Sequence, residues 1–260
     1  MKKKCNRWLV GLSVCAAFLQ GVAPLAQAGE IASGESVAGQ ISITVTSNVY
    51  TFLGRAGDRV KIRMTEIDPE IGPYIKLYNP QGKCFAYADS DCCQYRAAQI
   101  NVALRKDGVH TIICKDRESA TGKFNVCMVC LPGCALSTAD SDFGDLGVGQ
   151  TVAGSIDQAG DLDIAFFVAE PGDRILIRMS RLDKALDPSV QLYAPDGQCL
   201  SSSDKRNPQG VCELDTKIQK SGTYTIVCQD RYVNTGQYTL AVLPAPDKPF
   251  TLSGFPGDAK

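Results

Sequence analysis

Short runs of alternating apolar and polar residues dominate the chain beyond its N-terminal region. Residues 60–64 (VKIRM), 75–77 (IKL) and 100–104 (INVAL) all repeat with period two. That period is typical of strands with one buried face, because successive side chains point to opposite sides of a sheet. Turn sequences rich in Gly, Pro and Asp separate the runs. The pattern predicts an all-β chain of short strands packed as an antiparallel sandwich.

The strand pattern occurs twice. Residues 36–84 match residues 151–199 at an offset of 115, with 18 identities in 49 positions. Residues 108–126 match residues 222–240 at an offset of 114, with 8 identities in 19. A colinear match with one single-residue gap indicates a duplicated domain. We therefore expect two tandem sandwiches, over 29–132 and 151–245, joined by a linker at 133–150 and followed by a flexible tail at 246–260.

The inward positions of these strands predict one hydrophobic core in each copy. Each large apolar side chain buried there stabilises the fold by ~1.5–3 kcal/mol. The residues expected in the first core are Ile62, Leu77, Val102, Ile112 and Val126, and those in the second are Ile177, Leu192, Ile218, Ile226 and Leu240.

The first 28 residues have the order of a secretory signal peptide. A basic start (Lys2, Lys3, Lys4 and Arg7) precedes an apolar run at residues 8–19, and Ala-Gln-Ala at 26–28 gives a small-x-small cleavage signal. The run is shorter than the ~20 residues that cross a bilayer. We expect an exported protein, in the periplasm, on the cell surface or outside the cell, without membrane insertion. The net charge of −1 favours no nucleic-acid partner.

Several motifs resemble the bacterial pre-peptidase C-terminal domain family. Gly-Asp-Arg turns stand at Gly57 and Gly172, and Pro-x-x-x-Leu-Tyr-x-Pro-x-Gly hairpins begin at Pro73 and Pro188. The second copy closes with Thr-Gly-x-Tyr-x-Leu from Thr235. The first copy departs from the pattern with Asn48 in place of Asp and His110 in place of Tyr. The resemblance implies two jelly-roll-like β-sandwiches. It also implies an accessory role, because such modules often accompany secreted peptidases, and related modules bind insoluble substrates such as collagen or hold calcium.

Cysteine is the strongest chemical signal. Removal of the signal peptide takes away Cys5 and Cys15, and an even count in an exported chain predicts disulfides. The candidates are Cys84, Cys92, Cys93, Cys114, Cys127, Cys130, Cys134, Cys199, Cys212 and Cys228. The first choice pairs Cys199 with Cys212, and Cys84 with Cys92 or Cys93. The rival scheme pairs Cys84 with Cys114 and Cys199 with Cys228.

Zinc binding and redox activity are two alternatives to disulfide formation for these thiols. Cys127-x-x-Cys130-x3-Cys134 could supply thiolate ligands to zinc, with Cys92 or Cys93 completing a tetrahedral set. A redox-active Cys-x-x-Cys would instead begin a helix, where the helix dipole lowers the thiol pKa, whereas this one ends an expected strand. His110 is the only histidine and occupies the place of Tyr224, as a partly buried strand residue. Structural disulfides are favoured over both alternatives.

Aspartates suggest one candidate cofactor, calcium, which prefers carboxylate oxygens on loops. The candidate ligands are Asp140, Asp142, Asp145, Asp161 and Asp163, for which ordinary turn roles are the favoured alternative. Asp-Arg pairs recur in both copies, at Asp58, Asp116, Asp173 and Asp230, and are expected to cap turns and form exposed ion pairs.

The function expected from the sequence is binding rather than catalysis. The chain contains no Gly-x-Ser-x-Gly, His-Glu-x-x-His or phosphate-loop motif. We expect a non-enzymatic tandem module that binds extracellular protein or polysaccharide, with a structural cell-envelope or surface-assembly protein as the alternative. A cysteine-based metal or redox protein ranks third.

Overall fold

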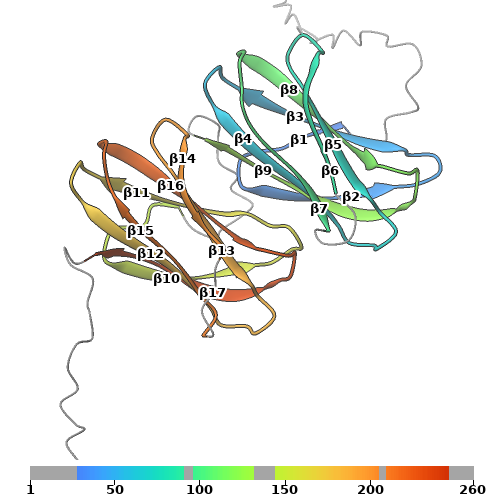
Figure 1. The fold of residues 1–260 in the computed structure, drawn as a ribbon. Coiled ribbons are helices and arrows are strands. Elements are labelled where there is room, and N and C mark those ends of the chain that lie inside the picture. Colours follow the sequence, from blue (N-terminus) through green and yellow to red (C-terminus); the bar gives the residue numbers. More distant parts are fainter. Residues whose placement is uncertain (1–27, 91–95, 132–143, 205–208, 246–260) are drawn as a thin grey trace, which may run out of the picture.

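The structure, a computed structural model, describes residues 28–90, 96–131, 144–204 and 209–245. Every named element there is a β-strand, so the expected all-β tandem sandwich is confirmed (Figure 1). None of the described segments forms an apolar helix of bilayer-spanning length. The expected signal peptide up to residue 27, most of the linker, the tail at 246–260, and Cys92, Cys93, Cys134, Asp140 and Asp142 lie outside the described residues.

The first sandwich consists of two sheets. One sheet has the order β1-β3-β8-β5-β6 and the other the order β2-β9-β4-β7. Their strands are β1 (Ala28–Glu30), β2 (Glu35–Ile41), β3 (Ser47–Gly54), β4 (Arg59–Glu66), β5 (Pro73–Tyr78), β6 (Cys84–Asp89), β7 (Ala97–Ala103), β8 (Gly108–Asp116) and β9 (Gly122–Leu131).

The second sandwich repeats this arrangement with the sheet orders β10-β17-β12-β15 and β11-β16-β13-β14. Its strands are β10 (Gln150–Ile156), β11 (Asp163–Ala169), β12 (Arg174–Arg181), β13 (Pro188–Tyr193), β14 (Cys199–Ser203), β15 (Val211–Lys217), β16 (Gly222–Asp230) and β17 (Gly236–Pro244). Apart from β1, the strand order of each copy is that of a jelly roll, two four-stranded sheets linked by Greek-key connections.

The register of pairing is also duplicated. Leu77 pairs with Ile112, and Leu192 with Ile226, each followed by a bulge before the next tyrosine. The structural equivalence of the two copies begins closer to the N-terminus of each copy than the sequence match does. Ile31 donates its N–H to the carbonyl of Thr51, and Leu146 does the same to Phe166, the position 115 residues on. Leu146 is buried in the second core, although it falls within the segment expected to be a linker.

The two cores lie between the sheets, as the alternation predicts. Nine of the ten expected core residues are buried, and Val102 packs half-buried against the first core. Tight turns bring the strands back. Gly57 and Gly172 both have positive φ in the Gly-Asp-Arg turns (101° and 102°), a conformation that glycine adopts without a steric penalty.

Candidate ligand-binding cleft between the two sandwiches

The two sandwiches dock face to face. The outer face of the β2-β9-β4-β7 sheet packs on the outer face of the β11-β16-β13-β14 sheet, and the two jelly rolls lie side by side (Figure 1). A separate apolar cluster forms where they meet. Its buried members are Cys127, Val129, Leu131, Leu162, Ile164, Tyr193 and Val227.

The sequence of β9 explains why this face is buried. Inward-facing Val126, Met128 and Cys130 belong to the first core, while Cys127, Val129 and Leu131 point to the other side of the same strand. A strand that is apolar on both faces needs a covering layer on both. The second sandwich supplies that layer, so the docking contact follows from the loss of alternation in β9.

Close backbone approach and polar contacts align the two units. Ser36 donates to Asp161 Oδ1 (2.6 Å), and Asn125 Nδ2 donates to the carbonyl of Ala159 (3.3 Å). Gly160 has φ of +85°, and a Cβ there would collide with the hydroxyl of Thr65 in the first sandwich. Glycine is therefore required at 160 both by its backbone conformation and by the space that the docking leaves.

The docking face changes from apolar to polar away from β9. Lys61, on β4, is only 2% exposed and donates to Gln191 Oε1 (2.8 Å) and Gln229 Oε1 (2.6 Å) of the second sandwich. Tyr193 also donates to Gln191 Oε1 (2.8 Å). The amides solvate the ammonium without neutralising it. Burial, together with the charge of nearby Arg63, lowers the pKa of Lys61 to about 7.

Arg63 stands two residues further along the same face of β4. It is 5% exposed, and among the described residues its one hydrogen bond runs from Nη1 to the carbonyl of Asp230 (3.1 Å). Burial lowers its pKa, although the nearby Asp230 carboxylate opposes that effect. A guanidinium carries five N–H donors, so most of its hydrogen-bonding capacity faces the space between the sandwiches.

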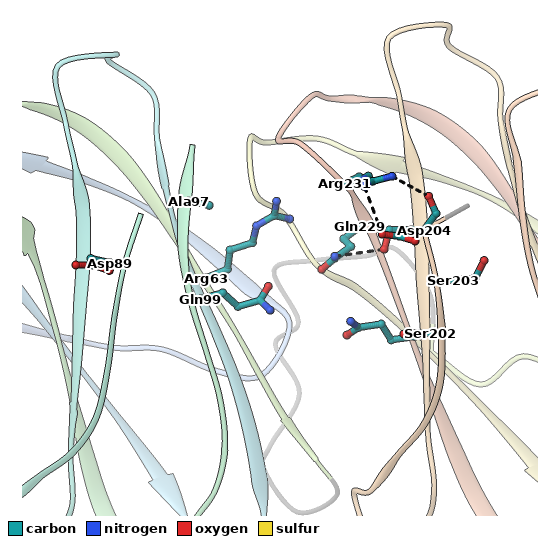
Figure 2. A pocket seen from close by; sticks show the side chains of 11 residues that line it. Arg63, Asp89, Ala97, Gln99, Ser202, Ser203, Asp204, Gln229 and Arg231 are labelled. Atoms are coloured by element: carbon teal, nitrogen blue, oxygen red, sulfur yellow. Dashed lines mark hydrogen bonds and ion pairs between the residues drawn. The ribbon is translucent and has the colours of Figure 1, made fainter. Parts of the chain in front are cut away.

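That space is a cleft of about 380 Å³. Figure 2 shows Arg63 pointing into it from the first sandwich, with Gln99 beside it and Gln229, Asp204 and Arg231 on the opposite wall. The lining also includes Asp89, Ala97, Ser189, Gln191, Ser202 and Ser203. Arg231 and Asp204 form an ion pair at 3.7 Å on the wall that belongs to the second sandwich. The walls are therefore rich in hydrogen-bonding groups.

The hydrophobic pattern and the motifs do not single out the residues that border the cleft, which are Lys61, Arg63, Gln99, Gln191 and Gln229. A signal existed in the comparison of the two copies. Lys61 corresponds to Leu176, and Gln99 corresponds to Glu213, at the offsets of 115 and 114. The two copies thus differ in charge and polarity on the same outer face of strands that otherwise match. Such a difference indicates that this face meets different surroundings in each copy.

Among the described residues, six of the seven candidate cysteines form no disulfide. Cys84, Cys114, Cys127, Cys199, Cys212 and Cys228 are free thiols. The rival scheme was wrong because of register. On strand β5, Cys84 pairs with Tyr78 and Cys114 pairs with Ile75. Three residues along β5 offset the two cysteines by roughly 10 Å, and β5 lies between the strands that carry them, so they are beyond the reach of a disulfide.

The second copy repeats this geometry. Cys199 pairs with Tyr193 and Cys228 with Val190, again three residues apart along the intervening strand. The first-choice Cys199–Cys212 bridge is also absent. Cys199 is exposed at the start of β14, whereas Cys212 is buried in the other sheet and donates to the carbonyl of Ser203 (2.9 Å). Cys130 is the one described cysteine that is disulfide-bonded.

The zinc hypothesis for Cys127 and Cys130 is contradicted by strand geometry. Residues three apart on a strand point to opposite faces. Cys127 accordingly lies in the docking cluster and Cys130 in the first core. Burial also raises the pKa of Cys127 to about 12, the reverse of what a redox-active cysteine requires.

The candidate calcium ligands that the structure describes do not lie around a common site. Asp161 accepts a hydrogen bond from Ser36 of the first sandwich and another from the N–H of the adjacent Leu162. Asp163 lies inside the second sandwich and accepts a hydrogen bond from the hydroxyl of Tyr238. Asp145 is exposed in a bridge to Phe166. Within the described ranges, no group of three or more His, Cys, Asp or Glu side chains forms a metal site.

His110 is a core residue, in agreement with the interpretation of the sequence. It is buried on β8 and stacks on Phe52 with ring centroids 5.4 Å apart. Tyr224 stacks on Phe167 in the same way at 5.5 Å. Burial lowers the pKa of His110. The only histidine of the chain therefore serves packing in the first sandwich, and it is not among the residues that line the cleft.

Lys61 makes the stability of the docked form dependent on pH. Its folded-state pKa of about 7 lies below the ordinary value of 10.5, so between these values the unfolded chain holds a proton that the folded chain has released. The free energy of unfolding therefore rises with pH from about 7 upward. Relative to a Lys61→Met variant, the wild type should gain on the order of 1–2 kcal/mol between about pH 7 and 8.5.

Urea denaturation of both proteins at the two pH values measures this gain. The comparison with Lys61→Met is needed because buried thiols such as Cys114 and Cys127 have raised pKa values, which lower stability as the pH rises through the range of an exposed thiol. That contribution is the same in both proteins and cancels in the difference. A difference that does not change with pH would contradict a buried, deprotonating Lys61.

Comparisons with known proteins bear on the fold. No family model and no curated protein matches the chain. Among solved structures, the pre-peptidase C-terminal domain of collagenase from Bacillus anthracis is 19% identical, with a TM-score of 0.34, over 40% of this chain and 96% of that one. The M60 catalytic domain with the CBM51-1 and CBM51-2 domains of Clostridium perfringens ZmpB is 10% identical, with a TM-score of 0.23, over 75% of this chain and 33% of that one. Membership of both copies in the pre-peptidase C-terminal family stays a prediction.

Proposed function

We propose that this protein is a non-catalytic binding module of an exported protein and that the cleft between its two sandwiches is the ligand site. Its ligand is an extracellular protein or polysaccharide. The observation that carries the proposal is Arg63, a cation buried to 5% exposure whose remaining donors face a polar cleft. Burying a charge without full hydrogen bonding is costly, and a ligand that completes those bonds recovers part of that cost.

Binding assays on insoluble polymers test this function. The wild type should be retained by at least one of collagen, cellulose and peptidoglycan. Gln99→Trp fills the cleft from β7 and should weaken that retention at least ~10-fold, which corresponds to a loss of about 1.4 kcal/mol. The matched control is Glu213→Trp, at the equivalent position on the uncovered face of the second sandwich, and it should bind like the wild type.

Two other results of the binding assays would contradict parts of this proposal. If the two tryptophan variants bind equally well, the ligand site is elsewhere on the molecule. If the wild type binds none of the polymers and instead self-associates, the structural surface-assembly role replaces the binding role.

A further inference from the structure

The duplication provides an internal template for what Arg63 should bind. In the second sandwich, Arg178 on β12 pairs in register with Glu213 on β15 and forms an ion pair with it at 2.5 Å. In the first sandwich, the equivalent Arg63 pairs in register with Gln99. The arginine is retained, while the carboxylate beside it is replaced by an amide.

The adjacent cross-strand pair also has an amide in the first sandwich where the second sandwich has a carboxylate. Arg174 forms an ion pair with Asp215 at 2.7 Å, whereas the equivalent Arg59 donates to the amide oxygen of Asn101 at 3.2 Å. The first sandwich thus lacks both carboxylates on the sheet face that borders the cleft. Surface ion pairs contribute only ~0–1 kcal/mol. The loss of the carboxylate matters more at Arg63, because docking leaves that side chain only 5% exposed.

From this difference we infer that the cleft binds a carboxylate of an acidic, extended peptide, with Arg63 as its principal partner. The inference rests on the proposed function and specifies the ligand of that site. The ligand carboxylate takes the place that Glu213 holds beside Arg178. Arg–carboxylate pairs are commonly bidentate, and they are roughly twice as strong as neutral hydrogen bonds.

The walls of the cleft favour a peptide over an acidic polysaccharide. Asp89 also lines it and repels a polymer that carries a carboxylate on every unit, whereas Asp204 is paired with Arg231. A single acidic side chain flanked by neutral residues avoids that repulsion. The cleft is also bordered by β7 and β14, each the last strand of its sheet, and strand edges are where extended peptides add by main-chain hydrogen bonding. Ser202, Ser203 and Gln191 offer further hydrogen bonds.

The inference can be tested with defined probes and one designed variant. The probes are an acetylated, amidated peptide Ala-Thr-Glu-Thr-Ala, its Gln counterpart, and trigalacturonate. Binding is followed by chemical shifts of the arginine Nε–H groups in the full chain. The Glu peptide should bind at least ~10-fold more tightly than the Gln peptide and should shift the Arg63 signal, because an ionised acceptor strengthens the hydrogen bonds.

Gln99→Glu is the decisive variant. It restores beside Arg63 the carboxylate that the second copy carries, so it should abolish the preference for the Glu peptide while the melting temperature is retained. Glu213→Gln, which makes the reverse exchange at Arg178, should leave peptide binding unchanged. Arg63→Gln should also lose the preference, and the melting temperature reveals whether that variant remains docked.

The outcomes separate this inference from the proposed function. Equal binding of the two peptides, or a Gln99→Glu variant that still prefers the Glu peptide, overturns the carboxylate inference. Tighter binding of trigalacturonate through Arg63 assigns the site to an acidic polysaccharide and overturns the peptide. If polymer retention remains sensitive to Gln99→Trp in either case, the cleft is still the ligand site and the proposed function stands.

Discussion

An aspartate in place of Ile164 is expected to separate the two sandwiches while each keeps its own fold. Ile164 lies on β11 within the docking cluster, facing Gly34 of the first sandwich at close range. The substitution removes a buried apolar side chain and places a carboxylate where no water reaches it. The docked arrangement should lose about 3–5 kcal/mol. Small-angle scattering should show a larger radius of gyration, and circular dichroism should show unchanged strand content.

The same strand provides the control. Val168 lies on the same outward face of β11, beyond the docked region, and is 67% exposed. Val168→Asp makes the identical chemical change in solvent, so its effect should stay within about 0.5 kcal/mol. Undocking should also return the pKa of Lys61 toward its ordinary value and abolish ligand retention. An Ile164→Asp protein with the dimensions of the wild type would show that the apolar cluster does not hold the sandwiches together.

The period-two alternation was sufficient to predict the cores and the sandwich fold. Ile62, Leu77 and Val126 are buried because successive side chains of a strand point to opposite faces, so alternate residues turn toward the facing sheet. Because the domain is duplicated, the equivalent residues Ile177 and Leu192 were also expected in a core, and they are buried. Both predictions concern contacts within one copy, where the local pattern and the fold obey the same constraint.

The contact between the copies was not predicted, because it depends on which outer faces meet. Lys61 has the polarity of an exposed strand position, yet docking buries it against two glutamines. Its long side chain reaches acceptors that no local pattern places beside it. The apolar Cys127, Val129 and Leu131 gave the usable signal, since they remove the alternation from β9.

The thiol pairings failed for a related reason. Spacing along the chain does not fix register, and register decided that Cys84 and Cys114 meet different residues of β5. The recurring Asp-Arg pairs were interpreted more successfully as turn caps. Asp116 accepts hydrogen bonds from the N–H groups of Gly72, Glu118 and Ala120. Its role follows from local turn chemistry, which a short motif does specify.

Removal of the equivalent carboxylate in the second copy should cause a large loss of stability. Asp230 is buried at the end of β16, where Oδ1 accepts from the N–H groups of Tyr232, Val233 and Asn234 and Oδ2 accepts from that of Asp187. Asp230→Ala leaves these donors without an acceptor. Each bond to an ionised group contributes ~1.5–3 kcal/mol and the set is not additive, so we expect a loss of about 3–5 kcal/mol. Urea denaturation of the full chain measures it.

The loss of stability in Asp230→Ala should extend to two features that depend on this carboxylate. Val233 has φ of 132°, a conformation unfavourable for a β-branched residue, and the bond to Asp230 helps to hold it. The Asp230 carboxylate also lies near Arg63 and favours its charged form, so Asp230→Ala should weaken docking as well as the second sandwich. Asp215→Ala, which removes a carboxylate from an exposed ion pair on β15, should cost less than about 1 kcal/mol. Equal losses in Asp230→Ala and Asp215→Ala would show that the loop of residues 231–235 does not depend on the buried carboxylate.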